Sequence, residues 1–238
     1  HNAHEATATP AAAPAAYGRI LGTFGATATH TPAEPIANEY ELCYKCHSAY
    51  QDATGLEGAR DVSADFETGN ASVHAVEQSV ATTINAGAFV GAWDNDSVLY
   101  CIDCHAVAGS SPAVAGPHVS AEAPVLVSPY LGALPANADL LCYDCHRYTT
   151  YYDETGTGDA GAAASWFADA TAGPLHGLHV RDHGFACATC HVSHGSPSNE
   201  ALIRPVIDFV RAGAGGSCIG PCHPSPDGGI TPGVVYAR

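Results

Sequence analysis

Apolar residues along this 238-residue chain come in short runs, and 25 glycines and 16 prolines interrupt nearly every one of them. Glycine and proline punctuate local structure, so this pattern favours turns and loops over long elements. No segment approaches the roughly 18 continuous apolar residues that a membrane helix needs. The pattern predicts a mostly irregular coil with a few short helices and strands, and no membrane span.

The pattern places a few elements within this coil. Short helices are expected at residues 74–85, around each of five cysteine pairs, and at residues 201–211, where Pro205 would kink or split the helix. Residues 17–27 and 233–238 are expected to form strands. Residues 1–35 are low in complexity and are predicted to be an N-terminal arm, and residues 36–238 a single domain. Loops this long count against a compact fold unless something other than an apolar core holds them together.

The five cysteine pairs share one feature, which is a histidine directly after the second cysteine. Four copies read C-x-x-C-H, and the last has one extra residue between its cysteines. They use all ten cysteines of the chain: Cys43, Cys46, Cys101, Cys104, Cys142, Cys145, Cys187, Cys190, Cys218 and Cys222. The histidines that follow them are His47, His105, His146, His191 and His223. In c-type haem attachment each cysteine forms a thioether with a haem vinyl group, and the next histidine binds the iron as its proximal ligand. The motifs therefore predict five covalently bound haem c groups, which would replace the missing apolar core.

Zinc sites and disulfides are the alternative interpretations of the cysteine pairs. Four-cysteine zinc sites would leave one pair over, and zinc has no need of a histidine directly after the second cysteine. Two cysteines three positions apart rarely bridge each other, and disulfides would leave the histidines unexplained. Haem accounts for every cysteine and for the recurring histidine.

Each haem iron has a second axial position, and this chain offers histidine but no methionine to fill it. Nine histidines lie outside the motifs: His1, His4, His30, His74, His118, His176, His179, His183 and His194. Two histidines on one iron give a low-spin, six-coordinate site at the low end of the range of potentials that axial ligands span. The histidine surplus therefore predicts bis-histidine ligation.

The net charge of the chain limits which classes of partner it can bind. The formal net charge is −16 at pH 7, and the propionates of each haem would add to it. This charge argues against nucleic acid and against anionic membrane surfaces as partners. Attachment through thioethers takes place beyond the plasma membrane, so we expect an exported protein, extracellular or at the cell surface, with the periplasm as the alternative. Residues 1–14 contain no leader of the secretory type, and we expect that one has been removed.

Short patches outside the five motifs carry a resemblance. The chain reads G-P-H-V-S around His118 and C-H-V-S-H-G-S up to and beyond His194. L-H-G-L-H-V contains His176 and His179, and S-V-H-A-V contains His74. Together with the motifs, these patches resemble the multihaem c-type cytochromes, especially extracellular electron-transfer cytochromes that polymerise into filaments. The resemblance implies that these histidines are distal ligands, often of a haem distant in the sequence.

The resemblance also ranks the distal candidates. His74, His118, His179 and His194 come first on motif context, while His30 and His176 compete for the fifth place. His183 lies only four residues before Cys187 and is expected at the surface or beside a ligand. His1 and His4 are expected to have no ligand role, because chain termini are seldom tied down.

The motifs and the resemblance imply electron transport and not catalysis. We expect a pentahaem cytochrome that passes electrons singly to redox partner proteins or extracellular acceptors. The resemblance further implies head-to-tail self-association into an extracellular filament, in which His30 would bind a haem of the adjacent subunit. Two alternatives remain open: a monomeric periplasmic shuttle, and a multihaem oxidoreductase. The second would need an open iron position, which the surplus of histidines makes unnecessary.

Overall fold

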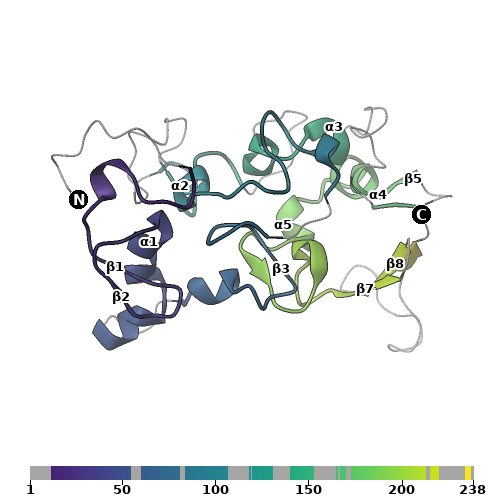
Figure 1. Ribbon diagram of the computed structural model, residues 1–238. Coiled ribbons are helices and arrows are strands. Elements are labelled where there is room, and N and C mark those ends of the chain that lie inside the picture. Colours follow the sequence, from purple (N-terminus) through teal and green to yellow (C-terminus); the bar gives the residue numbers. More distant parts are fainter. Residues whose placement is uncertain are drawn as a thin grey trace.

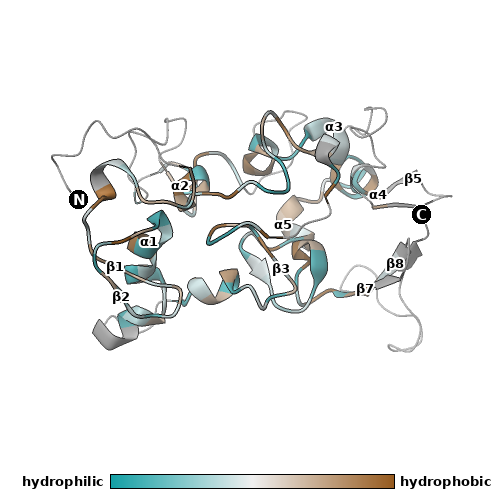
Figure 2. Ribbon diagram, in the orientation of Figure 1, coloured by the Kyte–Doolittle hydropathy of each residue, from teal (hydrophilic) through white to brown (hydrophobic). Residues whose placement is uncertain are grey.

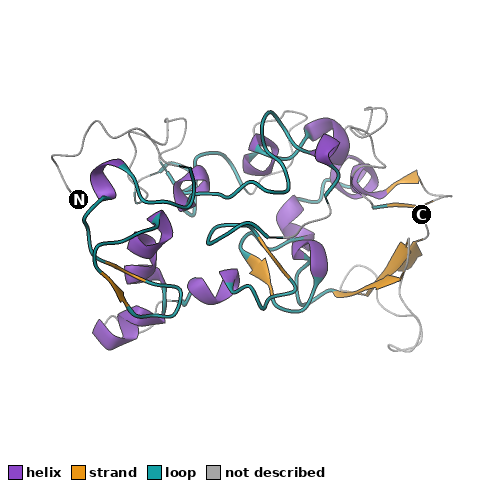
Figure 3. Cartoon of the chain, in the orientation of Figure 1, coloured by secondary structure: helices purple, strands orange, loops and turns teal. Residues whose placement is uncertain are grey.

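The computed structural model describes residues 12–54, 60–80, 84–106, 118, 120–130, 140–152, 165, 167–169, 173–212, 215–219 and 234–236. Most of the chain in these ranges is loop, and the helices and strands between the loops are short (Figure 3). The elements are drawn out along the molecule, with α1 near one end and β7 and β8 near the other (Figure 1). Within the described ranges, every helix is too short or too polar to cross a bilayer.

The described elements are few and small. The α-helices are α1 (Glu39–His47), α2 (Cys101–Cys104), α3 (Tyr148–Tyr151), α4 (Leu175–Gly177) and α5 (Cys187–Cys190). The 3₁₀ and π turns are η1 (Gly18–Ile20), η2 (Ala49–Thr54), η3 (Ser63–Phe66), η4 (Ala86–Ala88), η5 (Leu141–Asp144), η8 (Leu178–Asp182) and η9 (Glu200–Leu202). The strands are β1 (Gly25–Ala26), β2 (Pro32–Ala33), β3 (Ser72–Val73), β4 (Ala168–Asp169), β5 (Gly173–Pro174), β6 (Gly195–Ser196), β7 (Asp208–Ala212), β8 (Gly215–Ile219) and β9 (Val234–Tyr236).

Helix α1 is the longest described helix, and its start is set by local sequence. Glu41 accepts the backbone N–H of Asn38 at 2.9 Å, which satisfies a donor that the helix itself leaves unpaired. Glu39 and Glu41 lie in the first turn, and Lys45 and His47 lie in the last. Acidic residues at the N-terminus and basic residues at the C-terminus both interact favourably with the helix dipole.

Residues 12–35 pack against α1 and do not stand apart as an arm. The hairpin β1–β2 pairs Gly25 with Ala33, and Ala26 is fully buried beside Tyr44 of α1. Ile36 is buried with Ala16, next to Leu42 of the same helix. The low complexity of this segment did not reveal the packing, because alanine fits closely against a helix without leaving a strong apolar pattern.

The helix predicted at residues 74–85 is wrong for its described part. Residues 74–80 are extended or bent, and β3 just before them pairs antiparallel with β6. The N–H of His74 donates to the carbonyl of His194 at 2.8 Å, and the carbonyl of Ala75 accepts from Leu99 at 2.7 Å. Backbone groups committed to distant segments are unavailable for helical bonds.

The helix predicted at residues 201–211 is also wrong. Ala201 and Leu202 have positive φ of 55° and 56°, and the chain turns at Pro205 before strand β7 begins. Proline lacks the N–H that a continuing helix would need. Strand β8, which contains Cys218 of the fifth motif, pairs with both β7 and β9, so the helix expected around that cysteine is a strand.

The two predicted strands have different outcomes. The strand predicted at residues 233–238 is confirmed as β9, which pairs within the chain with β8. The strand predicted at residues 17–27 is wrong for its first half, where η1 forms, and only Gly25–Ala26 are extended as β1.

Buried apolar residues are few within the described ranges. Nearly half of the buried hydrophobic residues there are alanines, and apolar stretches are scattered along the ribbon (Figure 2). Some of the buried residues form two small clusters beside α1, one of Ala26, Tyr44, Phe66 and Val76 and the other of Ala16, Ala33 and Ile36. A chain of this length ordinarily buries one large continuous core.

Gly195 is the tightest point of the β3–β6 pairing and gives a direct test of it. A Cβ at this position would overlap the carbonyl oxygen of Asp65 and lie 3.0 Å from Val73 Cγ1. We expect Gly195→Ala to lower the free energy of unfolding by about 1–3 kcal/mol, the usual cost of overpacking. Gly69 is the control, because its Cβ would meet nothing within 4 Å. In guanidinium unfolding of the purified variants, Gly195→Ala should have a lower denaturation midpoint than the Gly69→Ala control. Equal midpoints would contradict the close approach of Gly195 to the carbonyl of Asp65.

Candidate functional site

The first four cysteine–histidine motifs each form one helical turn. The motif that ends at His47 is the second half of α1, the second and fourth motifs begin α2 and α5, and the third lies in η5. In the second, third and fourth motifs the histidine N–H donates to the first cysteine's carbonyl at 2.9, 2.8 and 2.9 Å. Positions i, i+3 and i+4 of a helical turn share one face. The two cysteines and the histidine of each motif are therefore presented together.

Four of the proximal histidines lie opposite a histidine from elsewhere in the chain. The ring contacts between histidines in the described part are His47–His118 at 6.4 Å, His74–His146 at 6.4 Å, His105–His194 at 6.0 Å and His176–His191 at 6.3 Å between centroids. Each pair joins one histidine predicted to be proximal to one predicted to be distal. The folding of the chain, and not proximity in sequence, makes most of these pairs.

The separation within the pairs fits two imidazoles on one metal ion. A metal–imidazole bond is about 2 Å long and the ring nitrogen lies about 1.1 Å from the ring centre, so two rings on opposite sides of one ion have centroids about 6.3 Å apart. Most other ring contacts in the described part are closer, as between Phe66 and His194 at 4.9 Å, although those of His179 and His183 with Phe185 are also 6.3 Å. The four histidine pairs therefore have the spacing that a haem iron between two axial imidazoles requires.

Burial favours the neutral form of six of the paired rings. Burial, followed by the influence of neighbouring imidazoles, lowers the pKa of His146 to about 4 and that of His176 to about 3. The pKa values of four more are lowered, in each case mainly by burial: His74, His105, His191 and His194. Imidazole binds a metal through the lone pair of its neutral form. These rings are thus in the metal-binding form at neutral pH.

Hydrogen bonds from Nδ1 orient several of the rings. His74 bonds the carbonyl of Ser193 at 2.5 Å and His105 bonds that of Val125 at 3.2 Å. His191 does the same with the carbonyl of Ala201 at 2.8 Å. A carbonyl oxygen only accepts, so Nδ1 carries the proton and the lone pair is on Nε2. This arrangement is typical of histidines that bind a metal through Nε2.

His176 is the residue whose role the structure changes most. The sequence ranks it behind His179, yet its ring lies 6.3 Å from His191, nearly parallel at 17°. Tyr151 and Phe167 approach it edge-on at 5.1 Å each. Its Nδ1 is buried and has no hydrogen-bond partner among the described residues.

The other three candidates lie elsewhere. His179 bonds the carbonyl of Leu175 through Nδ1 and contacts the rings of Phe167 and Phe185. The Nε2 of His30 is 2.9 Å from Ser63 Oγ, at the partly exposed turn of the β1–β2 hairpin. His183 is exposed beside Phe185, as expected for a residue that is not a ligand. Cys222 and His223 lie outside the described residues, and the prediction that a distal histidine faces His223 stays a prediction.

The first two motifs meet at a buried carboxylate that sequence reasoning missed. Glu39 of α1 accepts the backbone N–H of Cys101 at 3.1 Å, and its carboxylate and the thiols of Cys43 and Cys101 have ligand atoms within 4.8 Å of one another. Burial raises the pKa of this carboxyl. In the described part of the chain this is the one group of three or more side chains that could hold a metal ion. It does not provide the four cysteine or histidine ligands of a structural zinc site.

The later motifs also lie near one another in sequence order. The neighbouring Cys187 thiol, followed by burial, raises the pKa of the Cys142 thiol, which indicates that the third motif lies beside the fourth. Burial and then the nearby Cys104 raise the pKa of the Cys145 thiol to about 12, and burial and then Cys190 raise that of Cys218. These effects indicate that the described parts of successive motifs lie near one another.

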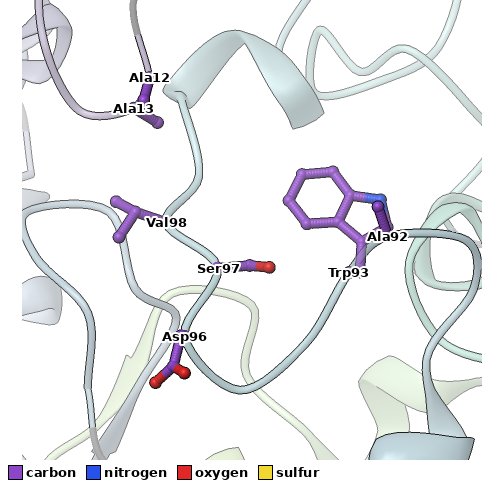
Figure 4. A pocket seen from close by; sticks show the side chains of 7 residues that line it. All are labelled: Ala12, Ala13, Ala92, Trp93, Asp96, Ser97 and Val98. Carbon is purple, nitrogen blue, oxygen red and sulfur yellow. The ribbon is translucent and has the colours of Figure 1, made fainter.

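A surface hollow lies away from these residues. Its volume is about 410 Å³, and its lining residues are Ala12, Ala13, Ala92, Trp93, Asp96, Ser97 and Val98 (Figure 4). None of these side chains is a thiol or an imidazole. The hollow therefore shares no residue with the motifs or with the histidine pairs.

Comparison with known proteins identifies no relative: no protein-family model, no curated protein and no solved structure matches the chain. The motifs and the geometry of the described residues are therefore what indicates its function.

Proposed function

We propose that this protein is a multihaem c-type cytochrome that carries electrons along a row of five haems and catalyses no reaction itself. The supporting observation is the set of four proximal–distal histidine pairs, each at the spacing of two imidazoles on one iron. Two imidazoles on one haem iron would leave a substrate no open coordination position.

The motif residues would hold the haems. The two cysteines of each motif would form the thioethers, and His47, His105, His146, His191 and His223 would be the proximal ligands of the irons. His118, His194, His74 and His176 would complete the four described sites in that order. When bound, haem supplies one-electron chemistry in which a ferrous iron gives one electron to a ferric neighbour and the two exchange oxidation states.

The protein's own residues provide the conditions for this exchange. The contacts between successive motifs bring neighbouring sites together, because a thioether ties each haem edge to its cysteines. Hydrogen bonds from Nδ1 to main-chain carbonyls hold His74, His105 and His191 in one orientation. Ligands fixed in this way need little rearrangement when the iron changes oxidation state.

The spectrum of the purified holoprotein tests this function. We expect five haems per chain by haem-to-protein ratio, and absorption and resonance Raman spectra of fully low-spin, six-coordinate iron in both oxidation states. A clear five-coordinate population would contradict the assignment and favour the oxidoreductase alternative. Metal analysis that finds zinc in place of iron would contradict it altogether.

We propose further that the protein is exported and assembles head to tail into an extracellular filament. A heterologous contact of this kind propagates because it does not close on itself. With His176 placed opposite His191, His30 and His179 remain for His223. His30 lies at a hairpin turn with a side chain 36% exposed, where another subunit can reach it once its contact with Ser63 is released.

Electron microscopy and two variants test the assembly. We expect filaments from the wild type, and from His30→Ala no filaments and one iron per chain without its sixth ligand. His179→Ala is the comparison: if it alone produces high-spin iron, the fifth site is completed within the chain and the role of His30 is refuted. Dispersed globules from the wild type would favour the monomeric shuttle.

A further inference from the structure

One distal histidine differs from the others in the partner of its second nitrogen. The Nδ1 of His194 is 3.2 Å from the carboxylate of Asp65. Among the other described Nδ1 contacts, His74, His105, His179 and His191 each bond a main-chain carbonyl. A carboxylate is a stronger acceptor than a carbonyl and carries a full charge.

The contact between Asp65 and His194 is built into the fold. Asp65 lies in η3, and its main-chain carbonyl is packed against Gly195, the residue next to His194. Phe66 packs its ring on that of His194 at 4.9 Å. The side chain of Asp65 is only 17% exposed, and Arg60 donates to both of its oxygens, at 2.7 Å to Oδ1 and at 2.5 Å to Oδ2, the oxygen that also faces His194. The guanidinium of Arg60 is 71% exposed, so water screens its charge more than it screens the carboxylate.

We propose that Asp65 is a positioning residue that gives the His105–His194 site the lowest reduction potential of the four described sites. This inference rests on the proposed function. A carboxylate that accepts the Nδ1–H of a ligand raises the basicity of that imidazole. A more basic ligand and a nearby negative charge both favour ferric over ferrous iron. At the other extreme, the Nδ1 of His176 has no acceptor among the described residues, which predicts the highest potential at the His176–His191 site.

The charge-removing variant Asp65→Asn tests the proposal. Asparagine keeps the size of the side chain and an oxygen that accepts the Nδ1–H, and it removes the charge. We expect the equilibrium constant for one reduction step to rise about tenfold, which is about 59 mV for one electron, with every iron still low-spin. Spectroelectrochemical titration measures the equilibrium constant of this reduction step. In electron paramagnetic resonance of the ferric protein, the low-spin signal of one haem should change.

Asp94 supplies the control. Its Oδ1 accepts from the hydroxyl of Ser97 at 2.8 Å and from the backbone N–H of Asp96 at 3.0 Å, so Asp94→Asn removes the same charge from a site without a histidine contact among these bonds. We expect its titration curve to match the wild type. An equal shift in the two variants would show a general charge effect and overturn the proposal. A superimposable Asp65→Asn curve, or a shift accompanied by high-spin iron, would overturn it as well.

A double variant assigns the effect to one site. In a His194→Ala background, Asp65→Asn should leave the titration curve unchanged, because the two changes act on the same ligand. A shift that persists in this background would place the effect elsewhere and refute the assignment. Failure of the proposed function is distinguishable, since it would appear in the wild type as an absence of low-spin haem before any variant is made.

Discussion

Produced without attached haem, the chain is expected to be unfolded. Nearly half of the buried hydrophobic residues of the described part are alanines, and the two clusters beside α1 contain four and three buried residues. Such clusters bury too little apolar surface to offset the conformational entropy of 238 residues. When a group binds only the folded chain, its binding free energy is also folding free energy. We expect the haem-free chain to show random-coil circular dichroism and poorly dispersed amide proton resonances.

The control for these spectra is the holoprotein, prepared from a host that attaches haem to the chain. An intermediate variant, Cys101→Ala combined with Cys104→Ala, removes one attachment site and should retain four haems at reduced stability. A haem-free chain that unfolds cooperatively in denaturant would contradict the prediction. It would show that the two small clusters suffice to hold the fold.

Replacing a distal histidine is expected to convert one haem to high spin. In His176→Ala, His191 would lose the imidazole opposite it, which lies 6.3 Å away in the native chain. Alanine offers no metal ligand, so water or an empty position replaces the nitrogen. The expected result is one high-spin iron among the haems of each chain, with a rise of its reduction potential. Resonance Raman and electron paramagnetic resonance spectra of the purified variants measure the fraction.

His183→Ala is the matched control for this experiment. His183 lies in the same segment, is exposed, and has its ring 6.3 Å from that of Phe185. Its replacement should leave the spectra unchanged. His118→Ala and His194→Ala should each reproduce the effect of His176→Ala at their own sites. If His183→Ala produces high-spin iron and His176→Ala does not, the pairing with His191 is not the ligation of the protein.

The sequence alone predicted the parts of the site that are local. Thioether attachment needs two cysteines and a histidine within one helical turn, so the spacing from Cys101 to His105 contains the whole requirement. The absence of methionine and the surplus of histidines likewise restricted the distal ligands to a short set. The many glycines and prolines predicted short elements, and the structure is mostly coil with small helices and strands.

Tertiary structure decided the pairing, because nothing local to an imidazole encodes its partner. The His74 segment was expected to be helical, but its backbone bonds His194, and this contact aligns two distal candidates for different motifs. His176 ranked below His179 on motif context, and only the packing of α4 against the fourth motif placed it opposite His191. Asp65 approaches His194 across 129 residues of sequence. Contacts between residues so far apart in sequence depend on how the whole chain folds. Only the folded structure could therefore show which histidine rings face each other and that a carboxylate lies beside the ring of His194.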